Sequence, residues 1–323
     1  MKIIFEPRSS IILYNFLSKI SKKKPFILPS NICPIVPAIF FKAKFPFEII
    51  DISLDTMEID KTVILEKLKK TPTAYSGILW LRSYGVNNNN EDLFKSIKKI
   101  NSSLVIIDDR CLMKPKFDHT YKHSDLIIYS TGYSKFVDYD WGGFGFINNK
   151  VYSYHSQKQI FINDHLRELT KSFKYCMEKG TKYEYSDSKW LGGTLELDYK
   201  NYKNKILNDL PNISKHKKRI NSLYLNNIPK QAQLPGNYHD WRFNILVNNK
   251  VQFLKSIINK KLFASNHYYP ITKLINYGYA PNSEKLFNHV INLFNDKRYT
   301  ETMAIDTIDI VNKHIKKWGV PEL

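Results

Sequence analysis

The chain has 323 residues and a formal net charge of +19, with 43% hydrophobic and 14% aromatic residues. This composition supports a substantial buried core and excludes a wholly disordered chain. The charge could indicate nucleic-acid binding, but the lysines are scattered along the sequence. We therefore expect a positive surface that favours an anionic small substrate, and no nucleic-acid partner.

Membrane and disulfide signals are weak in this sequence. No apolar run reaches the roughly 18–20 residues that a membrane-spanning helix needs, and Glu6 and Pro7 come too early for a secretory signal. The three cysteines, Cys33, Cys111 and Cys176, are far apart and lack C-x-x-C spacing. This pattern argues against a disulfide framework or a metal site, and predicts a cytoplasmic protein without a membrane span.

Strand-like and helix-like segments alternate in the first half of the chain. A helical pattern at residues 11–20 comes first. Five apolar segments then have the length of buried strands: residues 26–29, 47–52, 75–81, 104–107 and 126–129. Helical patterns separate most of them, at residues 32–41, 59–68 and 91–100. Continuously apolar strands that alternate with helices predict a largely parallel sheet covered on both faces.

The C-terminal part of the chain has a different texture. Residues 183–208 are polar and aromatic with little clear pattern, and residues 241–247 alternate as in a strand. Helical patterns are found at residues 158–179, 216–224, 251–262, 283–295 and 300–316. We predict a large domain of residues 1–210 and a small α+β domain of residues 211–323.

Polar side chains follow the ends of two predicted strands. Asp108 and Asp109 come directly after the fourth strand, and Ser130 and Lys135 follow the fifth. Ligands of parallel sheets collect at the carboxyl ends of strands, so these side chains are candidates for one site. A lysine held there can lose its proton, and the neutral amine can attack a carbonyl group. The alternatives are a surface lysine and carboxylates that cap turns or helices.

In their order and spacing, these segments resemble the sugar aminotransferases of the DegT/DnrJ/EryC1/StrS family over nearly the whole chain. The motifs that carry the resemblance include LRSYG, VIIDDRC, SDLIIYSTGYSKFVDYDWGGFGF and NHYYPI. The resemblance implies a three-layer α/β/α fold with a mostly parallel central sheet, which is the fold type I architecture of pyridoxal-phosphate enzymes. It also implies a homodimer, because in this family the second subunit completes each active site.

The resemblance assigns the catalytic roles to two residues. Lys135 would be the Schiff-base lysine that binds the cofactor, pyridoxal 5'-phosphate, and then moves protons between substrate and cofactor. Asp109 would pair with the pyridine nitrogen of the cofactor and keep it protonated, so that the ring can accept electrons. The interval of 26 residues between the two (135 − 109) is about the usual separation in the family.

The resemblance also assigns binding residues. Ser9, Ser10 and Ser130 would contact the cofactor phosphate, although helix capping alone would also explain Ser9 and Ser10. Cys33 lies where many relatives place an aromatic residue that stacks on the cofactor ring. Three residues would lie near the substrate: Tyr84, His267 and Tyr268.

Three departures accompany the resemblance, of which Cys33 is the first. Leu112 stands where a histidine or glutamine often follows the aspartate, and residues 182–193 contain no clean match to the Asn-x-Arg stretch of the family. The expected function is transfer of an amino group, with glutamate as donor, onto a nucleotide-linked keto sugar for a surface polysaccharide or glycan. The alternative is a family member that has lost transamination and acts as a binding or partner subunit.

Overall fold

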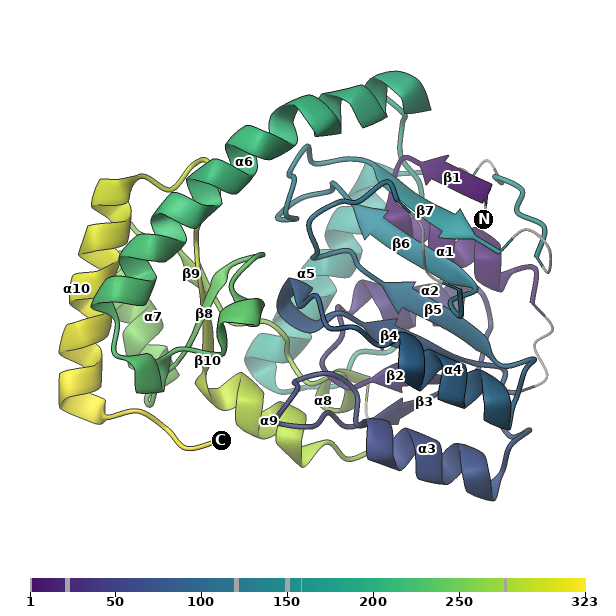
Figure 1. Ribbon diagram of the computed structural model, residues 1–323, viewed down its shortest axis with the longest axis horizontal. Helices are drawn as coiled ribbons and strands as arrows, with labels where there is room; N and C mark the ends of the chain where they lie inside the picture. Colours follow the sequence, from purple (N-terminus) through teal and green to yellow (C-terminus); the bar gives the residue numbers. More distant parts are fainter. Residues whose placement is uncertain (1, 21–23, 119–121, 149–151, 158, 276–277) are drawn as a thin grey trace.

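The computed structural model describes residues 2–20, 24–118, 122–148, 152–157, 159–275 and 278–323. Within these residues the chain forms two β-sheets surrounded by helices (Figure 1). The strands of the large sheet are β1 (Lys2–Glu6), β2 (Phe26–Pro29), β3 (Phe47–Ile50), β4 (Gly77–Leu81), β5 (Val105–Asp109), β6 (Leu126–Ser130) and β7 (Gly143–Ile147).

The large sheet is mostly parallel, as the apolar strands predicted. Its seven strands have the order β1-β7-β6-β5-β4-β2-β3. Strands β2 to β6 pair in parallel, whereas β7 is antiparallel to both β6 and β1. The carboxyl ends of β4, β5 and β6 therefore meet at one edge, where Leu81 pairs with Asp109 and Asp109 with Ile128.

Helices cover both faces of this sheet and make the predicted three layers (Figure 1). On one face lie α1 (Ser9–Leu17), α2 (Ile35–Lys42) and α5 (Asn163–Lys179), and on the other α3 (Lys61–Lys70) and α4 (Glu91–Ile100). Side chains of a strand alternate between faces, so Val105 and Ile107 of β5 pack toward α1 while Ile106 packs toward α4.

The second sheet lies in the C-terminal part of the chain. Its antiparallel strands, in the order β8-β10-β9, are β8 (Phe243–Leu246), β9 (Ala264–Ser265) and β10 (Val290–Leu293). The helices of this part are α7 (Lys250–Asn259), α8 (Ile271–Ile275), α9 (Pro281–His289) and α10 (Glu301–Trp318). Helix α6 (Tyr199–Asn227) runs from the large sheet to the small one (Figure 1).

Three short 3-10 helices complete the elements: η1 (Ser83–Gly85), η2 (Lys230–Ala232) and η3 (Gly236–Tyr238). The predicted domain boundary at residue 210 falls inside α6, next to Pro211, so the division at that position stays a prediction. None of the helices in the described ranges has both the length and the apolar composition needed to cross a bilayer.

Local patterns located most elements but not all of them. β2 and α4 have the predicted bounds. The helix predicted at residues 283–295 is wrong in its second half, because the apolar run Val290–Leu293 pairs with β8 as a strand. Among the strands and α-helices, five further elements or parts of elements were not predicted: β1, β7, β9, α8 and the first half of α6. The predicted start of α5, residue 158, lies outside the described residues.

Candidate active site

One cavity opens at the carboxyl ends of β4, β5 and β6. Six of the predicted residues line it, five of them from the proposed cofactor site: Ser9, Ser10, Cys33, Asp109 and Lys135. Tyr268 lines it as well, and aliphatic side chains such as Ile32, Val36 and Ile128 form much of its wall. The cavity holds about 530 Å³ of space not filled by protein atoms, its open mouth included.

Asp109 brings a buried carboxylate to this cavity. It ends β5 on the α1 side of the sheet and is only 5% exposed. Its Oδ1 accepts the backbone N–H of Cys111 at 3.0 Å. Burial raises the pKa of Asp109, and the nearby Lys135 only partly opposes this effect. A buried carboxylate is costly unless a cation accompanies it, so the cavity favours a ligand that carries positive charge at this end.

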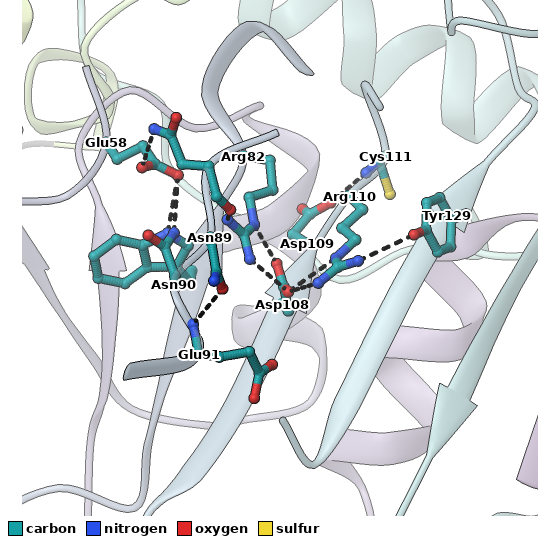
Figure 2. A network of polar contacts seen from close by, with 12 residues as sticks. Glu58, Arg82, Asn89, Asn90, Glu91, Asp108, Asp109, Arg110, Cys111 and Tyr129 are labelled. Carbon is teal, nitrogen blue, oxygen red and sulfur yellow. Dashed lines mark hydrogen bonds and ion pairs between the residues drawn. The ribbon is translucent and has the colours of Figure 1, made fainter. Parts of the chain in front are cut away.

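Asp108 has a different role, because it points to the opposite face of β5. Arg82 donates to both of its carboxylate oxygens, at 2.7 and 2.9 Å. Arg110 donates to Oδ2 through Nε and Nη2, at 2.8 and 2.5 Å, and also reaches the Tyr129 hydroxyl (Figure 2). Although burial alone would raise it, these arginines lower the pKa of Asp108 to about 2. Asp108 is thus the centre of a buried ionic network behind the site.

Lys135 is presented by a tight turn after β6. Its backbone N–H donates to Gly132 O at 3.3 Å, and the preceding Ser134 adopts a left-handed conformation with φ of 62°. Ser130, at the end of β6, accepts the Gly132 N–H at 3.2 Å through its hydroxyl. The structure therefore uses Ser130 to begin the lysine turn, and its predicted contact with a phosphate stays a prediction.

Ser9 and Ser10 form the first turn of α1, whose N-terminus faces the cavity. The helix begins at Ser9 and its N-cap residue is Arg8, so neither serine is the N-cap. The Arg8 side chain makes no capping hydrogen bond. Gly143 of β7 passes close to this turn, and a Cβ there would lie 2.6 Å from Ser9 Cα. A free helix N-terminus with two hydroxyls is a suitable site for a phosphate group.

The three residues predicted near the substrate form a connected group. Tyr268 is the member that lines the cavity. Tyr84 is fully buried behind it, with ring centroids 6.5 Å apart, and donates its hydroxyl to His267 O at 2.7 Å. Burial, aided by the charge of Arg242, lowers the pKa of His267 to about 3. His267 and Tyr84 therefore support Tyr268 from outside the cavity wall.

Sequence reasoning missed two contributors to this region. Cys111 also lines the cavity, and its position two residues after Asp109 could have revealed it, since alternate residues share a face. Arg242, immediately before β8, donates to the hydroxyl of Ser134, which lies 108 positions earlier in the sequence. No motif or spacing pointed to that contact.

Comparison with known proteins identifies the fold. No protein-family model matches the chain, and no curated protein matches it either. Among solved structures, a DegT DnrJ EryC1 StrS aminotransferase from Brucella abortus is 15% identical with a TM-score of 0.68, over 97% of this chain and 86% of that one. PseC of Helicobacter pylori, an aminotransferase involved in pseudoaminic acid biosynthesis, is also 15% identical, with a TM-score of 0.70 over 98% and 88%.

A third structure with this fold catalyses a different reaction. Escherichia coli GDP-4-keto-6-deoxy-D-mannose-3-dehydratase, solved with bound hydrated pyridoxal phosphate, is 12% identical with a TM-score of 0.63, over 96% of this chain and 87% of that one. Over nearly its full length the chain thus has the fold of these aminotransferases and of related pyridoxal-phosphate enzymes, which confirms the predicted fold type I architecture. The fold alone does not distinguish an aminotransferase from a dehydratase.

Proposed function

We propose that this chain is a pyridoxal-phosphate-dependent aminotransferase that acts on a keto sugar carried by a nucleotide diphosphate. Glutamate is the expected amino donor, and the amino sugar would enter a surface polysaccharide or glycan. The observation that carries the proposal is the convergence of Lys135 and Asp109 on one cavity from two adjacent strand ends. The activities named for the Brucella and Helicobacter proteins of the same fold support it.

The residues of the cavity fit the proposed cofactor. Asp109 is a buried carboxylate that a protonated pyridine nitrogen would neutralise. The first turn of α1, with Ser9 and Ser10, suits the phosphate group. Between them, the aliphatic wall suits a planar ring, with Cys33 as the neighbour that relatives replace by an aromatic side chain.

Each of these groups would have a defined task in transamination. Bound pyridoxal phosphate supplies an aldehyde that an amine can attack and a ring that accepts the electrons of a cleaved C–H bond. Lys135 would hold the cofactor covalently through Nζ, and would then use the freed Nζ to take a proton from the substrate carbon and return it. Asp109 would keep the ring nitrogen protonated, and the apolar wall would exclude water.

The direct test is optical. Purified protein should develop visible absorbance with pyridoxal phosphate, and borohydride should fix the cofactor to Lys135. The Lys135→Ala variant should lose this fixation, whereas Lys260→Ala, which changes an exposed lysine at the end of α7, should keep it. A protein that stays colourless with added cofactor would refute the proposal.

The reaction itself separates the remaining candidates. An aminotransferase should lose the aldehyde absorbance when glutamate is added, and should transfer the amino group to a nucleotide-linked keto sugar. A binding or partner subunit would show no change with glutamate. A dehydratase would release water from the sugar, which mass spectrometry of the sugar product detects.

A homodimer forms part of this proposal. No stretch between residues 182 and 193 matches the one with which relatives complete the neighbouring phosphate site. Gel filtration with light scattering should nevertheless give twice the 38.0 kDa mass of one chain. A monomer that binds the cofactor fully would remove the dimer and leave the assignment of Lys135 and Asp109 intact.

A further inference from the structure

We infer that Arg242 is a positioning residue for Lys135. Arg242 connects the turn that carries Lys135, which we call the lysine turn, to the small C-terminal sheet. The inference rests on the proposed function, in which Lys135 Nζ captures an aldehyde. It goes beyond that function because the aldehyde-binding cavity is lined by residues of other segments, whereas Arg242 lies immediately before β8.

Every polar group of Ser134, the residue before Lys135, is held. Its N–H donates to Asp138 Oδ2 of the same turn, at 3.1 Å. Its carbonyl accepts the indole N–H of Trp241 at 2.8 Å, and its hydroxyl accepts from Arg242 Nη2. Two of these three contacts therefore come from consecutive residues of the C-terminal part of the chain, more than 100 positions away.

Arg242 is built into its surroundings as a rigid support. It is only 5% exposed, and its guanidinium lies 3.6 Å from the ring centroid of Phe294. Nη1 donates to Ser265 Oγ at 2.5 Å, and that hydroxyl in turn lies 3.1 Å from His267 Nδ1. Since arginine presents its donors in a fixed planar fork, one side chain sets the distance between two segments.

Those two segments both supply walls of the cavity. One Nη group holds the turn that ends in Lys135, and the other holds Ser265, close to the loop that leads through His267 to Tyr268. Ser134 also needs such support because its φ of 62° is uncommon for a residue with a Cβ. Loss of the Arg242–Ser134 contact should therefore widen the range of positions of Lys135 without emptying the cavity of any group.

The test measures capture of pyridoxal phosphate by Lys135, because this step needs no sugar substrate. Ser134→Ala removes the hydroxyl that accepts from Arg242 but keeps the carbonyl that Trp241 holds. Ser222→Ala is the matched control, since the Ser222 hydroxyl donates only within α6, to Lys218 O at 2.9 Å. Visible absorbance gives the rate, and borohydride reduction followed by peptide mass analysis locates the cofactor on Lys135.

We expect Ser134→Ala to lower the maximal capture rate about tenfold, because small misplacements of a reacting group cost that much or more. The cofactor concentration for half-maximal rate and the melting temperature should stay close to those of the wild type, as should all values for Ser222→Ala. Arg242→Lys should show the same loss, because an ammonium cannot hold both hydroxyls in a fixed geometry. The double variant should be no slower than Arg242→Lys alone, since that substitution already removes the contact that Ser134→Ala removes.

Three results would overturn the inference. Capture by Ser134→Ala at the wild-type rate would refute this inference and leave the proposed function intact, even if Arg242→Lys fails to fold. A loss that falls on the half-maximal concentration instead of the maximal rate would assign the pair to cofactor binding. Absence of capture by the wild-type protein would remove the proposed function and this inference with it.

Discussion

Asp108 and Asp109 are adjacent in the chain, yet replacement by asparagine should strongly destabilise the cofactor-free protein at Asp108 and should not destabilise it at Asp109. Asp108→Asn leaves Arg82 and Arg110 without the carboxylate that both contact (Figure 2). All three side chains are at most 3% exposed, so water cannot replace the lost anion. Breaking a buried pair in this way costs about 3–5 kcal/mol of the free energy of unfolding.

The pH dependence of stability measures independently how much the charge of Asp108 contributes to the free energy of unfolding. Its pKa in the folded protein is about 2, below the ordinary value of 3.8. Stability linked to a depressed pKa is complete above the unfolded value and is lost as the pH falls through the folded value. The difference corresponds to about 2 kcal/mol. The wild type should lose that amount between about pH 4 and pH 2, and Asp108→Asn should not.

The charge of Asp109 contributes to stability with the opposite sign, because burial raises the pKa of this carboxyl group. The folded protein then binds a proton at this site more tightly than the unfolded chain does. Ionisation above the ordinary value of 3.8 therefore costs stability at neutral pH. Asp109→Asn, which removes the charge and keeps the shape, should leave the cofactor-free protein equally or more stable.

Urea unfolding at pH 7, followed by circular dichroism, measures both variants. Asp55→Asn, at an exposed position, serves as the control and should stay within about 0.5 kcal/mol of the wild type. The reasoning fails if Asp108→Asn costs less than about 1 kcal/mol, or if the two variants lose the same stability.

Three further expectations follow from single contacts. Thr300 caps α10 by accepting the Met303 N–H at 3.2 Å, so Thr300→Ala should lower the free energy of unfolding by about 1 kcal/mol in urea titrations and leave cofactor capture unchanged. Gly143→Ala places a Cβ against the Ser9 backbone, so it should cost roughly 1–3 kcal/mol and weaken binding of pyridoxal phosphate more than that of pyridoxal, as spectral titration would show. His267 has a pKa of about 3 in the folded protein, below its ordinary 6.5, because of burial and then Arg242; NMR should find it neutral from pH 5 to 8, with stability linked to it lost only as the pH falls from 6.5 toward 3.

The sequence predicted the five parallel strands of the large sheet and placed the candidate site at their carboxyl ends. Runs such as Phe26–Pro29 and Leu126–Tyr129 are apolar throughout because helices cover both faces of the sheet, and that pattern is visible without coordinates. The rule that ligands collect at strand ends then brought Asp109 and Lys135 together. The different fates of Asp108 and Asp109 follow from the alternation of side chains along β5, since only Asp109 shares a face with Ile107.

The elements that were missed depend on contacts distant in the sequence. Val290–Leu293 is equally compatible with the end of a helix, and pairing with β8 decides the outcome. The start of α6 has no continuous apolar stripe. Tyr202 and Ile206 are nevertheless fully buried, against the face of the large sheet opposite α1. The Arg242–Ser134 contact spans 108 positions, and neither residue stands out locally.

The departure at Cys33 affects how the cavity would hold its ligand. In the family that the sequence resembles, an aromatic side chain is expected at the position of Cys33, and stacked aromatic pairs contribute about 0.5–1.5 kcal/mol beyond their buried area. Here Cys33 and aliphatic side chains form much of the lining, and Tyr268 is the aromatic residue that reaches the cavity. Under the proposed function, the cofactor would be held at its two polar ends by Asp109 and the first turn of α1, and by Lys135. Under the proposed function, accurate placement of the lysine turn is then important, because the Cys33 thiol offers no ring on which the cofactor could stack.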